Sequence, residues 1–278
     1  MVKGQHRLLA LTLINFLHVC MSQRICDGCR RPRRVCLCAA YPSPPKATSG
    51  LVFILQHPLE HRRALATVPL LERSLRDCLV VKDRKFQGGK HIDLDRVLQQ
   101  VADGALKGFL LFPGPGSQAL DAAYVLFAID GTWQEAKEIY KAVAPRLLVS
   151  SSGIQQVQLP CLKGSLDCAT LALPGSIASC PTSTSGQAPA QQANDDSTWQ
   201  GVEPGSWLLR TEPAEGYVTT AEAVARAVAL IEADDGSLLH QLLAPLKLMT
   251  QLQAKYNPSL QLRLDKQACK ERLLGSVK

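Results

Sequence analysis

The chain has 278 residues, of which 46 % are hydrophobic and 20 % charged, and its formal net charge is +7. This composition is typical of a globular protein with a hydrophobic core, in one large domain or two small ones. A mildly basic surface permits a nucleic-acid partner without requiring one. The ten cysteines argue against a small disulfide scaffold, because four lie within residues 26–38 and six are scattered. They indicate a reducing compartment and one metal site.

Residues 1–23 contain an apolar stretch, LLALTLINFLHVC (8–20), behind Lys3 and Arg7. The stretch is too short to span a bilayer, and we expect no membrane partner. A basic segment before an apolar one is typical of a secretory signal, but no small-x-small cleavage site follows, and Met21 offers a second start. We interpret residues 1–23 as an alternative-start or targeting segment, and expect an intracellular protein of the cytoplasm, the nucleus or an organelle.

A cysteine cluster follows in RICDGCRRPRRVCLC (24–38), at Cys26, Cys29, Cys36 and Cys38. Four thiolates on two short turns can close a tetrahedral zinc site; the alternative is that they only pack or form disulfides. Five arginines against one acidic residue, Asp27, give this segment a local charge of +4. Such a charge is typical of a solvated loop or of a phosphate-contacting knuckle. In the second interpretation, the RNA-binding residues are Arg30, Arg31, Arg33 and Arg34.

Beyond a Pro-rich linker (41–46), apolar runs alternate with helical patterns. Strands are predicted over residues 51–56, 78–82, 124–130, 154–159 and 207–213, and a further strand in GFLLFPGPG (108–116) runs into a Gly/Pro turn. Helices are predicted over residues 57–75, 133–143, 220–232 and 238–253. A basic loop (82–91) follows the second strand, and Pro245 is expected to kink the last helix. This alternation predicts an α/β fold whose mostly parallel sheet is covered on both faces and binds ligands at the carboxyl ends of its strands.

The segment 161–206 is rich in Ser, Gly, Pro, Ala and Gln and lacks sustained periodicity. A loop of this length inside a compact domain is usually an insertion or disordered. We therefore interpret it as a low-complexity insert, and expect no fixed structure across residues 175–205.

The stretch AIDGTWQEAKEIY (128–140) joins a strand to a helix. Gly131 allows a tight turn, and Thr132 followed three residues later by Glu135 predicts a capping box. Asp130 is not explained by this local structure, because it places a charge at the end of an apolar strand. A carboxylate at that edge of the sheet can accept a proton or orient a nucleophile. Trp133 faces the same way as Tyr140 on the expected helix.

Several motifs, in one order along the chain, resemble those of the DTW-domain family of tRNA-uridine aminocarboxypropyltransferases. They are the cysteine cluster with Arg24 and Pro32, QHPLE (56–60) with Thr67, LFPG (111–114), IDGTW (129–133), LRTEP (209–213) and TTAEA (219–223). The resemblance covers most of residues 24–160 and 207–275. The chain departs from the family in its longer insert and in TTAEA, where the family usually has Ser-Thr-x-Glu. Because a hydroxyl is kept, we expect the helix cap to form.

The resemblance implies a SPOUT-like α/β fold, in which a C-terminal knot of loops binds S-adenosylmethionine. It also implies transfer of the 3-amino-3-carboxypropyl group of S-adenosylmethionine to N3 of a uridine in tRNA. The implied organisation is a zinc knuckle with its linker (24–46) and a catalytic domain (47–275) that contains the insert near 161–206.

The resemblance and the sheet-edge argument together predict the site. The predicted catalytic residues are Asp130, Thr132 and Trp133. The predicted cofactor-binding residues are Leu111, Phe112, Pro113, Gly114, Asp130, Leu209, Arg210 and Thr220. Asp130 would be the base or orienter for N3, and Trp133 would stack on the uridine or on adenine, or else anchor the helix in the core. His57 is predicted to contact RNA, the alternative being ordinary turn chemistry before Pro58.

Three other functions remain open at the level of sequence. An RNA methyltransferase that uses S-adenosylmethionine would share the fold group. A non-catalytic zinc-dependent RNA-binding protein would need the basic cluster but not Asp130. A DNA-binding regulator would rest on the cysteine knuckle alone and would leave the α/β core unexplained.

Overall fold

The structure is a computed structural model that describes residues 24–112, 123–150, 152–159, 218–262 and 264–265. The predictions for residues 1–23, for the strand over 207–213 and for the insert lie outside these residues. Among the helices that are described, none is long and apolar enough to cross a membrane.

Five parallel strands form one sheet in the order β2-β1-β4-β3-β5. The strands are β1 (Leu51–Gln56), β2 (Cys78–Lys82), β3 (Lys107–Leu111), β4 (Tyr124–Asp130) and β5 (Ile154–Val157). The near-continuous apolar sequences of β1 and β4 are typical of strands that are buried on both faces, whereas β2 is half-exposed and β5 contains two glutamines. Along β1, Val52 and Ile54 enter one core cluster, whereas Phe53 and Leu55 enter the other. The predicted parallel sheet is confirmed.

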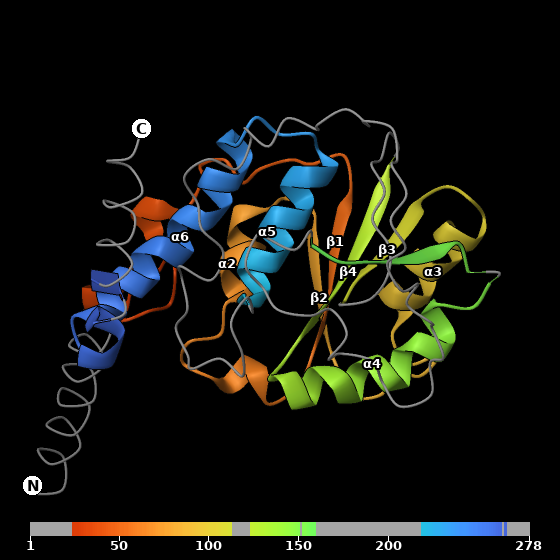
Figure 1. The fold of residues 1–278 in the computed structure, drawn as a ribbon, viewed down its shortest axis with the longest axis horizontal. Helices are drawn as coiled ribbons and strands as arrows, with labels where there is room; N and C mark the ends of the chain where they lie inside the picture. Colours follow the sequence, from red (N-terminus) through yellow and green to blue (C-terminus); the bar gives the residue numbers. More distant parts are fainter. Residues whose placement is uncertain (1–23, 113–122, 151, 160–217, 263, 266–278) are drawn as a thin grey trace, which may run out of the picture.

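Helices cover both faces of the sheet (Figure 1). One face carries α2 (Val68–Ser74), α5 (Thr220–Ile231) and α6 (Ser237–Ala254). The other face carries α3 (Ile92–Ala102) and α4 (Trp133–Leu147). We call these the α5 face and the α4 face, because they place the site residues described below.

One predicted helix needs correction, and one observed helix was not predicted. The helix predicted over residues 57–75 is broken into a 3-10 turn, η3 (Glu60–Arg62), and the short α2, in which Pro69 stands in the first turn. The strand predicted within 108–116 ends at Leu111, and most of the Gly/Pro turn expected after it lies outside the described residues. Helix α3 was not predicted. Helix α6 has Pro245 inside it, and the kink expected there stays a prediction.

The cysteine cluster packs beside α6 through two 3-10 turns, η1 (Arg33–Val35) and η2 (Cys38–Ala40) (Figure 1). Between them, Leu37 is fully buried in the core cluster of the α5 face. The cysteine cluster is therefore continuous with the core on the α5 face of the sheet.

Candidate active site and metal centre

Asp130 ends β4 at the carboxyl edge of the sheet and is 3 % exposed. Gln56, the last residue of β1, lies opposite it in the register, and its Nε2 donates a hydrogen bond to Asp130 Oδ2 at 2.7 Å. The main-chain N–H of His57 donates to the Asp130 carbonyl at 2.8 Å. Side chains alternate along a strand, so Asp130 points to the same side as Ala128, toward the α5 face. The carboxylate is buried and hydrogen-bonded rather than turned toward bulk solvent.

The N-terminus of α5 supplies polar groups on that same side. Thr219 is the N-cap, and its hydroxyl accepts a hydrogen bond from the Glu222 N–H at 3.2 Å, which confirms the predicted cap. Thr67, buried ahead of α2, accepts another from the Ala221 N–H at 3.4 Å. Thr220 is the first residue of the helix and is half-buried. The N-terminus of α5, which carries the positive end of the helix dipole, therefore lies on the face of the sheet toward which Asp130 points.

A second polar network lies on the α4 face of the edge. Glu135 Oε1 is 3.0 Å from Arg63 Nη2 and 3.3 Å from His57 Nδ1, and Arg63 also pairs with the buried Glu60. Burial disfavours the charge on Glu135, but hydrogen bonds from Thr132 and the nearby Arg63 and His57 outweigh it, so the pKa of Glu135 lies below its usual value. His57 is 2 % exposed, so its predicted RNA contact stays a prediction and would require access to a buried ring.

The predicted capping box is confirmed at the start of α4. The Thr132 hydroxyl accepts from the Glu135 N–H at 3.4 Å, and Glu135 Oε2 accepts from the Thr132 N–H at 2.7 Å. Space is limited here, since a Cβ on Gly131 would lie 3.0 Å from the Glu135 Cβ. Thr132 itself is exposed, and its role as the N-cap of α4 explains why a hydroxyl stands at this position.

Thr132→Ala is expected to lower the free energy of unfolding by about 1 kcal/mol, because an N-cap acceptor is lost. Urea unfolding measures this change, and Thr132→Ser should restore most of the loss. If Thr132→Ser is stable but as slow in turnover as Thr132→Ala, the residue has a role beyond the cap.

Aromatic side chains extend along α4 from its first residue. The Phe112 ring, just after β3, is stacked on Tyr140 with centroids 4.1 Å apart and on Trp133 with centroids 5.8 Å apart. Lys137 Nζ lies 5.2 Å from the centroid of the half-buried Trp133 ring. Because Trp133 stacks with Phe112 on the α4 face and Asp130 points to the α5 face, the two lie on opposite sides of one sheet edge.

The four sulfur atoms of Cys26, Cys29, Cys36 and Cys38 all lie within 4.8 Å of one another. Three of the separations are 3.4, 3.5 and 3.7 Å. A tetrahedral zinc with Zn–S bonds near 2.3 Å requires sulfur separations of about 3.8 Å, so the cluster fits this metal. Hydrogen bonds from the Cys29 backbone, and then from the Cys36 and Cys38 thiols, lower the pKa of the Cys26 thiol to about 6. All four are free thiols, so the disulfide alternative is not realised.

The arginines of the cluster lie mainly at the surface. Arg30, Arg33 and Arg34 are exposed, whereas Arg31 is half-buried. Their predicted RNA contacts remain predictions.

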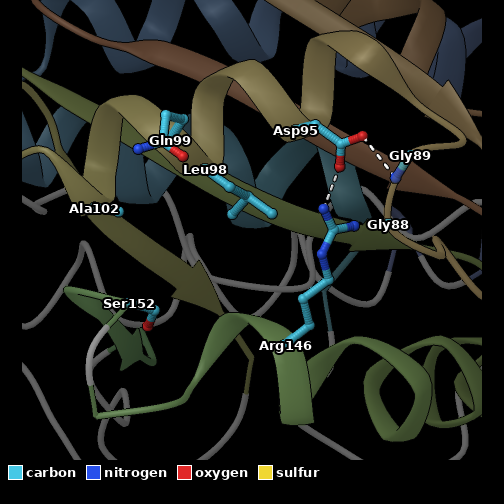
Figure 2. Close-up of a pocket in the computed structure, with 8 residues that line it drawn as sticks. All are labelled: Gly88, Gly89, Asp95, Leu98, Gln99, Ala102, Arg146 and Ser152. Atoms are coloured by element: carbon cyan, nitrogen blue, oxygen red, sulfur yellow. Dashed lines mark hydrogen bonds and ion pairs between the residues drawn. The ribbon is translucent and has the colours of Figure 1, made fainter.

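A hollow of about 430 Å³ lies between α3 and the end of α4 (Figure 2). Figure 2 shows the Asp95 carboxylate paired with the Arg146 guanidinium and accepting a hydrogen bond from the Gly89 N–H. The two charges offset each other. Arg146 is 13 residues beyond Trp133 on α4, about 20 Å along the helix axis, so this hollow is separate from the Asp130 edge.

The structure brings only part of the predicted site together. Leu111 and Phe112 lie at the edge beside β4, because Leu111 pairs with Ala128. Four predicted cofactor-binding residues lie outside the described residues, namely Pro113, Gly114, Leu209 and Arg210. Sequence reasoning missed Gln56 and Arg63 as members of the site. Gln56 carried the same signal as Asp130, a polar residue that ends an apolar strand.

Comparison with known proteins decides the family. Residues 23–254 match the family described as the DTW domain. The chain belongs to the DTW-domain family. The resemblance drawn from the motifs is thus confirmed, and the strand-terminal Asp130 and capped helix belong to a DTW domain.

This DTW-domain chain is 32 % identical to tRNA-uridine aminocarboxypropyltransferase 2 of Drosophila melanogaster over 216 aligned residues. The alignment covers 74 % of this chain and 66 % of that protein. It is 30 % identical over 256 residues to tRNA-uridine aminocarboxypropyltransferase A of Arabidopsis thaliana, with coverages of 84 % and 82 %. A mouse protein named tRNA-uridine aminocarboxypropyltransferase 2 is 33 % identical over 169 residues, which are 53 % of this chain and 55 % of that protein. No solved structure gives a significant match.

Proposed function

We propose that the protein transfers the 3-amino-3-carboxypropyl group of S-adenosylmethionine to N3 of a uridine in tRNA. The observation that carries the proposal is the buried Asp130 carboxylate, held by Gln56 at the carboxyl edge of a parallel sheet, in a DTW domain whose relatives bear this activity in their names. Ligands of parallel α/β sheets bind at this edge.

The chemistry defines what the residues must do. The sulfonium of S-adenosylmethionine supplies an electrophilic carbon in its amino-acid arm. The N3–C bond forms as the C–S bond breaks, 5′-methylthioadenosine leaves, and the N3 proton must be accepted. Asp130 accepts or polarises that proton, and the Gln56 amide fixes its carboxylate. The pocket selects this reaction over methyl transfer by holding the amino-acid arm of S-adenosylmethionine, rather than its methyl group, in line with N3.

The other parts of the site follow from the same edge. Leu111, which packs against the core of the α5 face, would begin the donor site next to β4, with Thr220 at the start of α5, whereas the Phe112 ring lies on the α4 face. The C-terminal knot implied by the SPOUT-like fold would use LRTEP, outside the described residues. Zinc in the four-cysteine cluster would act structurally, since the cluster packs beside α6 rather than beside Asp130.

The decisive experiment incubates the full chain with S-adenosylmethionine and unmodified tRNA, and measures small-molecule products and digested nucleosides by mass spectrometry. We expect 5′-methylthioadenosine and a uridine heavier by one aminocarboxypropyl group, in equal amounts. S-adenosylhomocysteine with a methylated nucleoside would instead identify a methyltransferase. tRNA binding without consumption of S-adenosylmethionine would identify a non-catalytic RNA-binding protein.

A further inference from the structure

The β2–α3 loop (83–91) and α4 form a basic surface for which the proposed chemistry has no use. We define the basic track as Arg84, Lys85, Lys137 and Lys141. Three of these are exposed and Lys137 is half-buried. Arg84 Nη2 lies 3.0 Å from Glu138 on α4, which joins the loop to the outer side of that helix. Counted together with Glu138, the acidic partner of Arg84, the four cations give a charge of +3.

We propose that the basic track binds the phosphate backbone of the RNA strand that carries the target uridine. The inference rests on the proposed function, which supplies an RNA substrate. What it adds is the path of that RNA, which crosses the α4 face of the sheet edge, whereas the donor site occupies the α5 face.

The track leads to the active-site edge. Lys137 lies one helical turn beyond Trp133 with its ammonium over the indole ring, and Lys141 lies one turn further, about 12 Å from Trp133 along the axis. Trp133 in turn follows Asp130 by three residues. A base stacked on Trp133 would take the place of the Lys137 ammonium on the ring, and its neighbouring phosphates would then pair with Lys137 and with the cations further along α4. Arginine and lysine contacts to phosphate supply most of the sequence-independent affinity for nucleic acids.

The loop that carries Arg84 and Lys85 is anchored rather than free. Asp83 Oδ2 lies 2.7 Å from both Lys90 Nζ and His91 Nε2. Phe86 is buried in the core of the α4 face, and Arg146 donates a hydrogen bond to its carbonyl at 2.9 Å. A loop that is already ordered loses little conformational entropy when it binds phosphate. Its internal acid, Asp83, is occupied within the loop, so it does not neutralise the outer cations.

Lys85 and Lys141 show no acidic partner among the residues that the structure describes. The one ion pair on the track, Arg84 with Glu138, is exposed at both ends and contributes little to stability. Phosphate can replace Glu138 as the partner of Arg84 at small cost. These features favour a polyanion over an apolar partner.

The test compares two triple variants of the full chain with equal charge loss. The track variant is Arg84→Gln, Lys85→Gln and Lys141→Gln. The control is Arg76→Gln, Lys107→Gln and Lys255→Gln. All three cations are exposed; Arg76 and Lys107 lie at the amino ends of β2 and β3, and Lys255 follows α6 of the α5 face. For the track variant, we expect Kd and KM for tRNA to rise at least about tenfold near physiological salt, and the slope of log Kd against log salt to fall by about 2. The kcat and the KM for S-adenosylmethionine should stay at the values of the wild type.

Each outcome has a separate meaning. Equal Kd and salt dependence for the track variant, the control and the wild type would overturn the inference, and so would a wild type that does not bind tRNA. Binding by fluorescence anisotropy needs no turnover, so a wild type that binds tRNA without forming 5′-methylthioadenosine would refute the proposed function and still test the track. If the triple variant misfolds by circular dichroism, Lys85→Gln alone should give about a third of the change in slope.

Discussion

Asp130→Asn is expected to lower the rate of aminocarboxypropyl transfer by roughly 10³-fold while the protein stays folded. Asparagine has the same shape and can still accept the hydrogen bond from Gln56 Nε2, which is 2.7 Å from Asp130 Oδ2 in the wild type. It cannot take up the N3 proton of a uridine. Single-turnover formation of 5′-methylthioadenosine at saturating tRNA measures the loss, and the thermal midpoint reports the fold.

Asp77→Asn is the matched control, because it makes the same chemical change at a side chain that is 44 % exposed and lies just before β2 rather than at the carboxyl edge. This variant should turn over at the rate of the wild type. If Asp130→Asn also turns over at that rate, the proton is accepted by another group, and the role proposed for the sheet edge is wrong.

Apolar runs predicted three strands at their observed bounds, β1, β2 and β4. Of these, β1 and β4 are buried along nearly their whole length and need no alternation to be recognised. Helix α3 was overlooked because its polar residues are interspersed among the apolar ones in IDLDRVLQQVA, so that no apolar run marks it. Its signal was nevertheless present, since Leu94, Val97, Leu98 and Val101 follow the spacing of one helix face. The helix predicted over 57–75 failed because the chain there forms a turn that carries Glu60 and Arg63 into the site.

The candidate site was predictable only where a residue broke a local rule. Asp130 did so as a charge at the end of an apolar strand, and the four cysteines did so through their spacing. The contact of Arg63 with Glu135 joins residues 72 positions apart and depends on how η3 meets α4. Asp130 and Trp133 are close in the sequence but lie on opposite faces of the sheet. This becomes visible only when the two core clusters show which residues of β4 point to which face.

Removal of zinc is expected to destabilise the whole domain rather than the knuckle alone. Leu37 lies between two of the predicted ligands and is fully buried in the core of the α5 face, so the metal and that core hold the same segment. We expect one zinc per purified chain by atomic emission. Cys29→Ser should lose the metal and lower the free energy of unfolding by on the order of 3 kcal/mol or more.

Cys78→Ser is the matched control, because Cys78 is a free, half-buried thiol in β2 outside the cluster. It should keep one zinc per chain. Gly28→Ala tests the geometry without removing a ligand, since the added Cβ would lie 2.7 Å from Cys38 Sγ, and it should weaken zinc retention against a chelator. If Cys29→Ser and Cys78→Ser hold equal zinc and unfold at equal urea concentrations, the cluster is not a structural metal centre. Zinc loss without destabilisation would mean that hydrophobic packing of Leu37 alone holds the knuckle against α6.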